Sequence, residues 1–520
     1  MAVGKNFLEN LTSAMYENSF TVYREFIQNA ADSIDKAVEC GLITIDDATI
    51  DIHIENAKRR IAVYDNACGI SMREFKKKMT DVADSDKDRD TEKGFRGIGR
   101  LAGLGYCDRL VFHTTVKGED KESIISWDGV ALREIVDDPT AHPTSDELID
   151  KITSIEYKPA EKEDHFFEVI MEDVIFESDD LLDEEQVSRY LSAVAPVPYK
   201  NHFIFSSKIK DFAKENKFRI DEYTVLVNGK QMFKPYGTIL YEGSSEKRTE
   251  YDQITDVQFR VFNSPAGKPI AWLWYGICKF EKNIPVVNEM RCIRLRKENI
   301  QIGDESAIGS PRFFKETRGS GYFVGEVFAV DKGLIPNARR DYFNPNPATK
   351  QFEDALHLFF YQELYELYHY ASKVRSAQKT VANFRKKEDE FNEKTENAGF
   401  IDSEEREAAQ KELDEERERA AKAEREIANR KKDTEDNEIY RRVFTAIEET
   451  YKPAEPAQTG TGKKSEKADK KQNKYMTQNL SKFKSKDQKL IARIYGIIKN
   501  ILPKDMADLV IKKIQEELSK

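Results

Sequence analysis

The sequence predicts an α/β protein with a helical C-terminal region, and three observations support this order. An apolar helical segment near the amino end is followed by short apolar runs with strand character. A second strand-rich region follows, and beyond Pro347 apolar residues recur at helical spacing among many charges. We therefore expect an α/β sandwich over residues 1–200, with helices layered on one face of a mixed sheet. A second α/β domain over 201–348 and a helical region should follow.

The first informative segment, residues 23–36, places three polar side chains on one face of a helix. Glu25, Asn29 and Asp32 are spaced by four and three residues, so they stack one above the other among apolar neighbours. A carboxylate and a carboxamide on such a helix suit a metal ion and an attacking water. An ordinary solvated face is the alternative that this segment alone leaves open.

The second segment is a short strand that ends in a turn. The apolar run 61–64 leads into Asp65-Asn-Ala-Cys-Gly69. Such a strand can aim the Asp65 carboxylate into a pocket, while Gly69 lets a ligand approach the backbone. An aspartate that merely forms the turn is the alternative interpretation.

The third segment is rich in glycine and runs from Lys93 to Gly103. Gly94, Gly97 and Gly99 precede an expected helix, where backbone N–H groups can face phosphates. No Gly-Lys-Ser/Thr follows, so this is not a Walker loop. No βαβ unit with a downstream acidic residue is evident either, which argues against a dinucleotide fingerprint.

In this order the three segments resemble the GHKL ATPase superfamily, which includes gyrase B, the ninety-kilodalton heat-shock chaperones, MutL, MORC proteins and histidine kinases. The first segment, extended upstream through Leu11 and Met15, is closest to the chaperones of the HtpG type. The glycine segment is more like MutL, and the short link from Gly69 to Gly94 is more like MORC. The family's glycine two residues after the aspartate is replaced here by Ala67.

The resemblance implies a Bergerat-type nucleotide-binding sandwich that binds ATP and Mg²⁺. Carried over residue by residue, it makes Glu25 the general base, Asn29 a Mg²⁺ ligand and Asp65 the acceptor for the adenine amino group. It also assigns further contacts: Asp32 to the ribose or an outer layer, Gly69 to close packing of the base, and Lys93, Gly94, Arg96, Gly97, Ile98 and Gly99 to the lid around the phosphates.

A site of this kind needs a cation at the γ-phosphate. The segment Pro336-Asn337-Ala-Arg339-Arg340-Asp341 resembles the chaperone middle-domain segment that supplies one. By that match Arg340 reaches the γ-phosphate, with Arg339 as the alternate, and the guanidinium fork suits phosphate oxygens. A solvated loop with two ordinary surface arginines is the other interpretation.

The second α/β domain resembles the family's transducer, or middle, domain. Residues 227–230, Val-Asn-Gly-Lys, predict a hairpin turn. The alternating arginines of residues 290–297 indicate either a lever-like strand or the solvent-exposed face of a strand, and we favour the exposed face.

The remaining chain divides into a helical arm over 349–451, a disordered linker over 452–474 and a helical module over 475–520. Asp402 with Glu405 is typical of a capping box that restarts a helix. The apolar seam of the arm is thin, so we prefer a helical hairpin to a coiled coil or a solvated single helix. Two amphipathic helices in the last module each need a partner surface, which indicates dimerisation or docking on the body.

Composition favours an intracellular protein. Five cysteines form no close pairs in the sequence, which argues for a reducing compartment. No secretory core and no run of eighteen apolar residues occur, so we expect a cytoplasmic protein without a membrane partner. The net charge of −11 argues against the whole chain being a simple nucleic-acid binder. The Lys-rich run 463–489 could touch nucleic acid or an acidic partner, although a tether is favoured.

These features together predict an ATP-hydrolysing homodimeric clamp gated by nucleotide. Our first hypothesis is an Hsp90-like chaperone that acts on protein clients. The alternative is a MORC- or MutL-like clamp on DNA, in bacterial defence or repair. A nucleotide-binding regulator with little turnover is a third hypothesis, which Ala67 favours and which Glu25 and Arg340 oppose.

Overall fold

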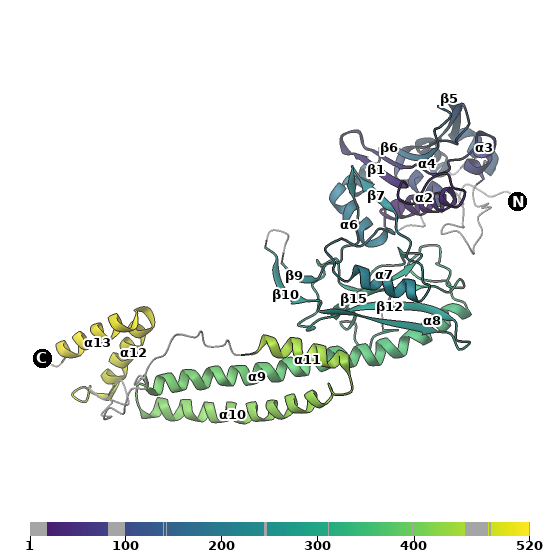
Figure 1. The fold of residues 1–520 in the computed structure, drawn as a ribbon. Coiled ribbons are helices and arrows are strands. Elements are labelled where there is room, and N and C mark those ends of the chain that lie inside the picture. Colours follow the sequence, from purple (N-terminus) through teal and green to yellow (C-terminus); the bar gives the residue numbers. More distant parts are fainter. Residues whose placement is uncertain are drawn as a thin grey trace. The chain divides into compact units, whose positions relative to one another are not determined.

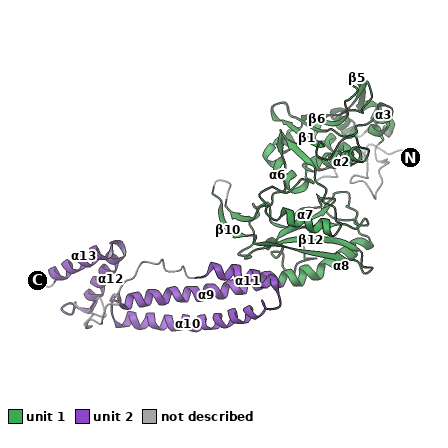
Figure 2. Cartoon of the chain, viewed as in Figure 1, with its two compact units in different colours: residues 1–365 green, residues 366–520 purple. Residues whose placement is uncertain are grey.

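The computed structural model describes residues 18–81, 99–138, 140–141, 143–243, 247–309, 311–396, 399–452, 477 and 480–518. The chain divides into two compact units, Met1–Tyr365 and Glu366–Lys520 (Figure 1 and Figure 2). Most of the expected linker 452–474 lies outside the described residues, as does the upstream match at Leu11 and Met15.

The first unit begins with an eight-stranded sheet in the order β5-β4-β3-β6-β2-β1-β7-β8. Neighbouring strands are antiparallel except for β1 and β7, which run parallel. The strands are β1 (Thr49–Glu55), β2 (Arg60–Asp65), β3 (Cys107–Thr115), β4 (Lys121–Asp128), β5 (Thr153–Pro159), β6 (Phe166–Val174), β7 (Thr224–Val227) and β8 (Lys230–Gln231).

Helices pack on one face of this sheet, as expected for an α/β sandwich (Figure 1). They are α2 (Thr21–Glu39), α3 (Met72–Thr80), α4 (Gly129–Asp137), α5 (Ser145–Ile152) and α6 (Glu184–Val194), with short 3₁₀ helices η2 (Asn56–Lys58), η3 (Gly99–Gly105) and η4 (Phe176–Leu182). Strand alternation separates the faces: Leu110 and Phe112 of β3 join the large core, whereas Val111 joins a small cluster on the other face.

The central helix α2 is buried over most of its length because its small and aliphatic residues face the sheet. Phe26, Ile27 and Ile34 are each at most 3% exposed. The helix ends at Glu39, and Gly41, two residues further on, has a φ of 72°, the left-handed conformation that glycine adopts just after helix ends. This burial fixes the polar residues that share the helix.

The sheet continues past the expected boundary at residue 200. β7 pairs with β1, and β7 and β8 form the hairpin predicted from Val227-Asn-Gly-Lys230. Asn228 and Gly229 both have positive φ, at 47° and 77°, as the tight hairpin turn requires.

A second sheet of the first unit has the order β11-β12-β15-β13-β14. Its strands are β11 (Asp256–Asn263), β12 (Pro269–Ile277), β13 (Cys292–Lys297), β14 (Ile300–Gln301) and β15 (Val324–Ala329). A separate hairpin is formed by β9 (Ile239–Glu242) and β10 (Thr249–Gln253). The helices of this region are α7 (Ser206–Glu215), α8 (Pro347–Leu358), a 3₁₀ helix η5 (Ser320–Tyr322) and a π-helix η6 (Phe359–Leu364).

Aromatic contacts hold helices on both faces of this second sheet (Figure 1). Phe212 of α7 stacks on Phe259 with ring centroids 4.2 Å apart and contacts Trp272 of β12. On the opposite face, Tyr275 of β12 meets Phe359 of the π-helix at 5.8 Å. The five-stranded sheet is thus covered by a helix on each face.

The arginine-rich segment forms strand β13, but our preference for an exposed face was wrong near the carboxyl end of this strand. Arg294 is half-buried, and Arg296 is completely buried. The buried guanidinium of Arg296 pairs with the Glu326 carboxylate of the neighbouring strand 324–329, which explains the difference.

The second unit contains three long helices, α9 (Tyr365–Glu396), α10 (Ser403–Lys432) and α11 (Glu438–Thr450). α9 and α10 run antiparallel (Figure 2) and are joined by cross-pairs such as Lys387 with Glu412 at 2.8 Å and Arg417 with Glu388 at 3.2 Å. Asp402 caps α10 by accepting a hydrogen bond from the Glu405 amide.

The same unit ends in a helical pair, α12 (Ser485–Ile501) and α13 (Lys504–Leu518). Its small core is formed by Leu480, Tyr495 and Ile511. Several large apolar side chains remain exposed on the two helices: Leu490, Ile494, Ile497, Ile501, Met506 and Leu509. Among the helices of the described regions, none is long and apolar enough to span a lipid bilayer.

Candidate functional site

Glu25 lies on α2 and faces a guanidinium from the distant loop 336–343. Its Oε1 is 2.8 Å from Nε of Arg340 and 3.8 Å from Nε of Arg24. All three side chains are largely buried, at 9%, 12% and 7% exposed. The structure therefore brings together two residues that the sequence analysis selected from opposite ends of the first unit.

The loop that carries Arg340 is a tight hairpin. Pro336 and Phe343 form an antiparallel bridge, and the Asn337 amide donates to the Tyr342 carbonyl at 2.9 Å. Arg340 sits at φ 54°, a left-handed conformation that a non-glycine residue rarely adopts. This turn directs Arg340 toward α2, so Arg340 is not an ordinary surface arginine.

Arg339 differs from its neighbour. The residue is exposed, and its backbone carbonyl accepts a hydrogen bond from Nη2 of Arg24 at 3.3 Å. The structure thus separates the two candidates: Arg340 faces Glu25, while Arg339 contributes a backbone contact to Arg24. Sequence reasoning gave no role to Arg24.

The described end of the glycine segment lies against the same carboxylate. A Cβ built on Gly99 would overlap Oε2 of Glu25, so only glycine lets the backbone approach this closely. The expected helix begins here as the 3₁₀ helix η3. The other lid candidates lie outside the described residues: Lys93, Gly94, Arg96, Gly97 and Ile98.

Asp65 ends β2 and is 3% exposed. Burial raises the pKa of its carboxyl to about 8, although hydrogen bonds from the Ala67 amide and the Ser33 hydroxyl act in the opposite direction. Ala67 is fully buried and donates to Oδ1 of Asp65 at 3.1 Å. Ser33 follows Asp32 on α2, and sequence reasoning missed it.

The other polar residues of α2 differ in how far they are buried. Asn29 is half-buried, and Asp32 is 5% exposed. Gln28, which sequence reasoning also missed, is 1% exposed, and both its amide atoms are without a hydrogen-bond partner among the residues described. Gln28 follows Ile27 on the buried part of α2, and water or a further polar group can satisfy its amide.

The packing around Gly69 explains why this position is a glycine. It adopts φ 68°, and a Cβ there would overlap the Thr115 carbonyl and lie 2.8 Å from the Phe166 carbonyl. The backbones of β3 and β6 occupy this space. The packing of the protein itself therefore requires glycine here.

Asn29 is the residue that the sequence analysis assigned to Mg²⁺. In the described part of the chain, no group of three or more His, Cys, Asp or Glu residues could hold a metal. Asn29 offers one carboxamide oxygen near Glu25. Mg²⁺ takes oxygen ligands and usually keeps waters and phosphate oxygens, and the Asn29 carboxamide has an oxygen of this type.

Residues 16–158 match the family model described as histidine kinase-, DNA gyrase B- and HSP90-like ATPase. The matched segment holds Glu25, Asn29, Asp65 and Gly99. With the mixed sheet and its single helical layer, it is a GHKL ATPase domain, a domain of ATP-binding ATPases. Arg340 and the second sheet lie beyond the matched segment. Among curated proteins, none matches this chain.

Proposed function

We propose that this chain hydrolyses ATP at the α2 site, with Glu25 as the general base and Arg340 as the cation at the γ-phosphate. The observation that carries this proposal is the 2.8 Å ion pair between them. Glu25 would orient the attacking water, and the transferred phosphoryl group must lie next to that water. Arg340, which is held beside Glu25, is therefore placed where the phosphoryl group needs positive charge.

The ion pair suggests how the site would change when ATP binds. A triphosphate is a stronger partner for a guanidinium than one carboxylate, because its oxygens accept several parallel hydrogen bonds. Arg340 would therefore shift its contact from Glu25 to the phosphate and leave the carboxylate available for water. Arg24 would stay and hold the Arg339 backbone.

The other residues of the site would bind and orient the nucleotide. Asp65 would accept a hydrogen bond from the adenine amino group, and Asp32 would support the ribose side. Asn29 would hold Mg²⁺, which when bound supplies positive charge to the phosphate oxygens. Gly99 would let the lid backbone close over the phosphates.

A Glu25→Gln variant tests the assignment of the base. It keeps the size of the side chain and removes the charge, so we expect ATP binding within threefold of wild type. We expect hydrolysis to fall by about 10² or more. Calorimetry and phosphate release measure the two separately. Hydrolysis at the wild-type rate would overturn the assignment.

For the biological role, we propose a dimeric clamp gated by ATP that acts on protein clients, like the heat-shock chaperones. The first helical segment and the Pro336–Arg340 segment support this. The exposed apolar side chains of α12 and α13 supply a surface suited to a second copy. Replacing Ile494 and Ile497 with Asp should make a dimer dissociate in sedimentation experiments, whereas a monomeric wild type would refute this part.

The alternative is a DNA clamp similar to MORC or MutL proteins. The short link from Gly69 to Gly94 and the ten Lys against three acidic residues in 463–489 favour it. Stimulation of ATP hydrolysis by unfolded protein, compared with stimulation by DNA, separates the two. Stimulation by DNA should fall steeply with added salt, because phosphate contacts release counterions.

A further inference from the structure

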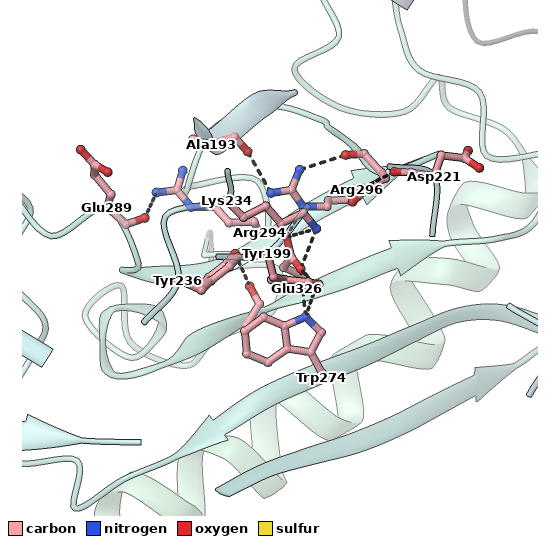
Figure 3. Close-up of polar contacts among 12 residues, drawn as sticks. Ala193, Tyr199, Asp221, Lys234, Tyr236, Trp274, Glu289, Arg294, Arg296 and Glu326 are labelled. Atoms are coloured by element: carbon pink, nitrogen blue, oxygen red, sulfur yellow. Dashed lines mark hydrogen bonds and ion pairs between the residues drawn. The ribbon is translucent and has the colours of Figure 1, made fainter. Parts of the chain in front are cut away.

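Arg296, the last residue but one of β13, is fully buried and donates to acceptors on three different segments (Figure 3). Its Nε donates to Glu326 of β15, and its Nη1 donates to the Asn299 carbonyl at 3.0 Å. Its Nη2 donates to the Ala193 carbonyl of α6 at 2.9 Å. An ammonium also has three donors, but all of them sit on one nitrogen, whereas the guanidinium spreads its donors over three nitrogens and can reach acceptors that lie farther apart.

Glu326 is the only carboxylate that Figure 3 shows bonded to Arg296, and further donors surround it. Lys234 donates to both its oxygens, at 2.9 and 3.1 Å, and Trp274 Nε1 donates at 2.9 Å. Burial alone would raise the pKa of Glu326, but Arg296 and Lys234 outweigh it and lower the pKa to about 2. The carboxylate therefore stays charged and keeps Arg296 in place.

The contact with Ala193 connects the two sheets of the first unit. α6 packs with the core of the eight-stranded sheet, while β13 belongs to the five-stranded sheet. A second contact of the same kind lies next to it, because the Asn299 side chain donates to the Asp221 carbonyl just ahead of β7. The turn between β13 and β14 is therefore attached to the nucleotide-binding half of the unit.

The same hairpin holds the backbone of Arg340. Glu298 and Asn299 form its turn with φ values of 52° and 60°, and the Ile302 amide donates to the Leu295 carbonyl at 2.8 Å. The next residue, Gly303, donates its amide to the Arg340 carbonyl at 2.7 Å. A Cβ on Gly303 would overlap the Asp341 carbonyl, so the two backbones pack directly.

We propose that Arg296 is a positioning residue for Arg340: it fixes the β13–β14 hairpin against α6, and the hairpin holds Arg340 beside Glu25. The proposal rests on the function proposed above. Arg296 itself bonds to neither Glu25 nor Arg340. The proposed effect passes from Arg296 along the β13–β14 hairpin to Gly303, and from Gly303 to the loop 336–343 that carries Arg340.

A purely structural role for Arg296 makes a different prediction. It would reduce the amount of folded protein, but each folded molecule would turn over at the normal rate. A positioning role lowers turnover and leaves ATP affinity nearly unchanged, because the adenine and ribose contacts lie elsewhere. If Arg296 acts by positioning Arg340, its substitution should also have no effect on turnover once the Arg340 side chain is removed.

The test is steady-state ATP hydrolysis by the full chain, with Arg296→Lys, Arg340→Ala and the double variant. Arg296→Lys keeps a charge beside Glu326 but cannot reach all three acceptors. We expect kcat to fall about tenfold with KM within twofold. The control Arg294→Lys changes a half-buried arginine on the same strand and should leave both constants unchanged. In the Arg340→Ala background, Arg296→Lys should lower kcat no further.

Gly303→Ala changes the other end of the path and serves if Arg296→Lys does not fold. It should lower kcat in the wild-type background and not in Arg340→Ala. Wild-type kcat in both Arg296→Lys and Gly303→Ala, or an equal loss in both backgrounds, would overturn the inference while leaving the proposed function intact. An Arg340→Ala variant with normal kcat would instead overturn the role of Arg340, and the inference with it.

Discussion

Arg340 ion-pairs with Glu25, with Nε of the arginine 2.8 Å from Oε1 of the carboxylate. The carboxylate proposed to orient the attacking water is thus neutralised by the cation proposed to sense the γ-phosphate. On our proposal, a bound triphosphate would compete with Glu25 for the Arg340 guanidinium and free the carboxylate to orient water. The adjacent Arg339 is exposed, so a substitution of Arg339 is a suitable control for a substitution of Arg340.

Arg340→Ala should lower kcat for ATP hydrolysis by about 10²–10³, because the transition-state charge loses its guanidinium. Nucleotide affinity should fall less than kcat, since the proposed adenine contact at Asp65 and the proposed Mg²⁺ contact at Asn29 do not involve the Arg340 side chain. Arg339→Ala should keep at least half of the wild-type kcat, because its bond to Arg24 uses the backbone carbonyl. Equal losses in the two variants would contradict the assignment.

Gly99→Ala should reduce hydrolysis at least tenfold, because its Cβ would displace the Glu25 carboxylate, which Arg340 and Arg24 hold from other sides. The matched control is Gly496→Ala on α12, where a Cβ meets nothing within 4 Å. Turnover numbers of both variants check this. A Gly99→Ala enzyme with normal turnover would mean that the lid backbone moves away from Glu25.

ATP affinity should rise with pH between about 6 and 8. Burial raises the pKa of the Asp65 carboxyl to about 8, so this carboxyl is largely protonated below that pH. An adenine amino group favours the carboxylate, so binding releases a proton and strengthens by up to about tenfold per pH unit. Above pH 8 the affinity should level off.

Calorimetry in buffers of different ionisation enthalpy measures both the affinity and the released proton. Asp65→Asn should weaken binding and remove the pH dependence. Affinity that stays constant from pH 6 to 8 in the wild type would argue against adenine recognition by Asp65.

The buried charge cluster makes a prediction about stability. Glu326→Gln leaves Arg296 and Lys234 buried without a counter-charge, which should cost about 3–5 kcal/mol of the free energy of unfolding. Lys234→Met should cost far less, because Glu326 keeps Arg296, Trp274 and Tyr199 as donors. Midpoints of denaturant unfolding compare the two, and equal losses would contradict this account of the cluster.

Local pattern was sufficient to predict the helix that carries Glu25 and the strand that delivers Asp65. The spacing of polar residues on a helix and a strand followed by a turn are properties of neighbouring residues. The Asn228-Gly229 turn was predictable for the same reason, because it demands positive φ at two successive positions.

Long-range partners were not predictable from local pattern. Arg296 alternates with apolar residues as on an exposed strand face, but Glu326, Lys234 and the Ala193 carbonyl are brought to it by other elements. The pairing of β7 with β1 likewise joins segments far apart in the chain. Arg340 was selected only by resemblance, and its contact with Glu25 depends on a loop that Gly303 holds.

The most direct measurement is a crystal structure of the full chain with Mg²⁺ and a non-hydrolysable ATP analogue. We predict the adenine at Asp65, the γ-phosphate between Glu25 and Gly99, and Arg340 turned from the carboxylate to the phosphate. A triphosphate bound elsewhere, or bound there with Arg340 still paired to Glu25, would contradict the account.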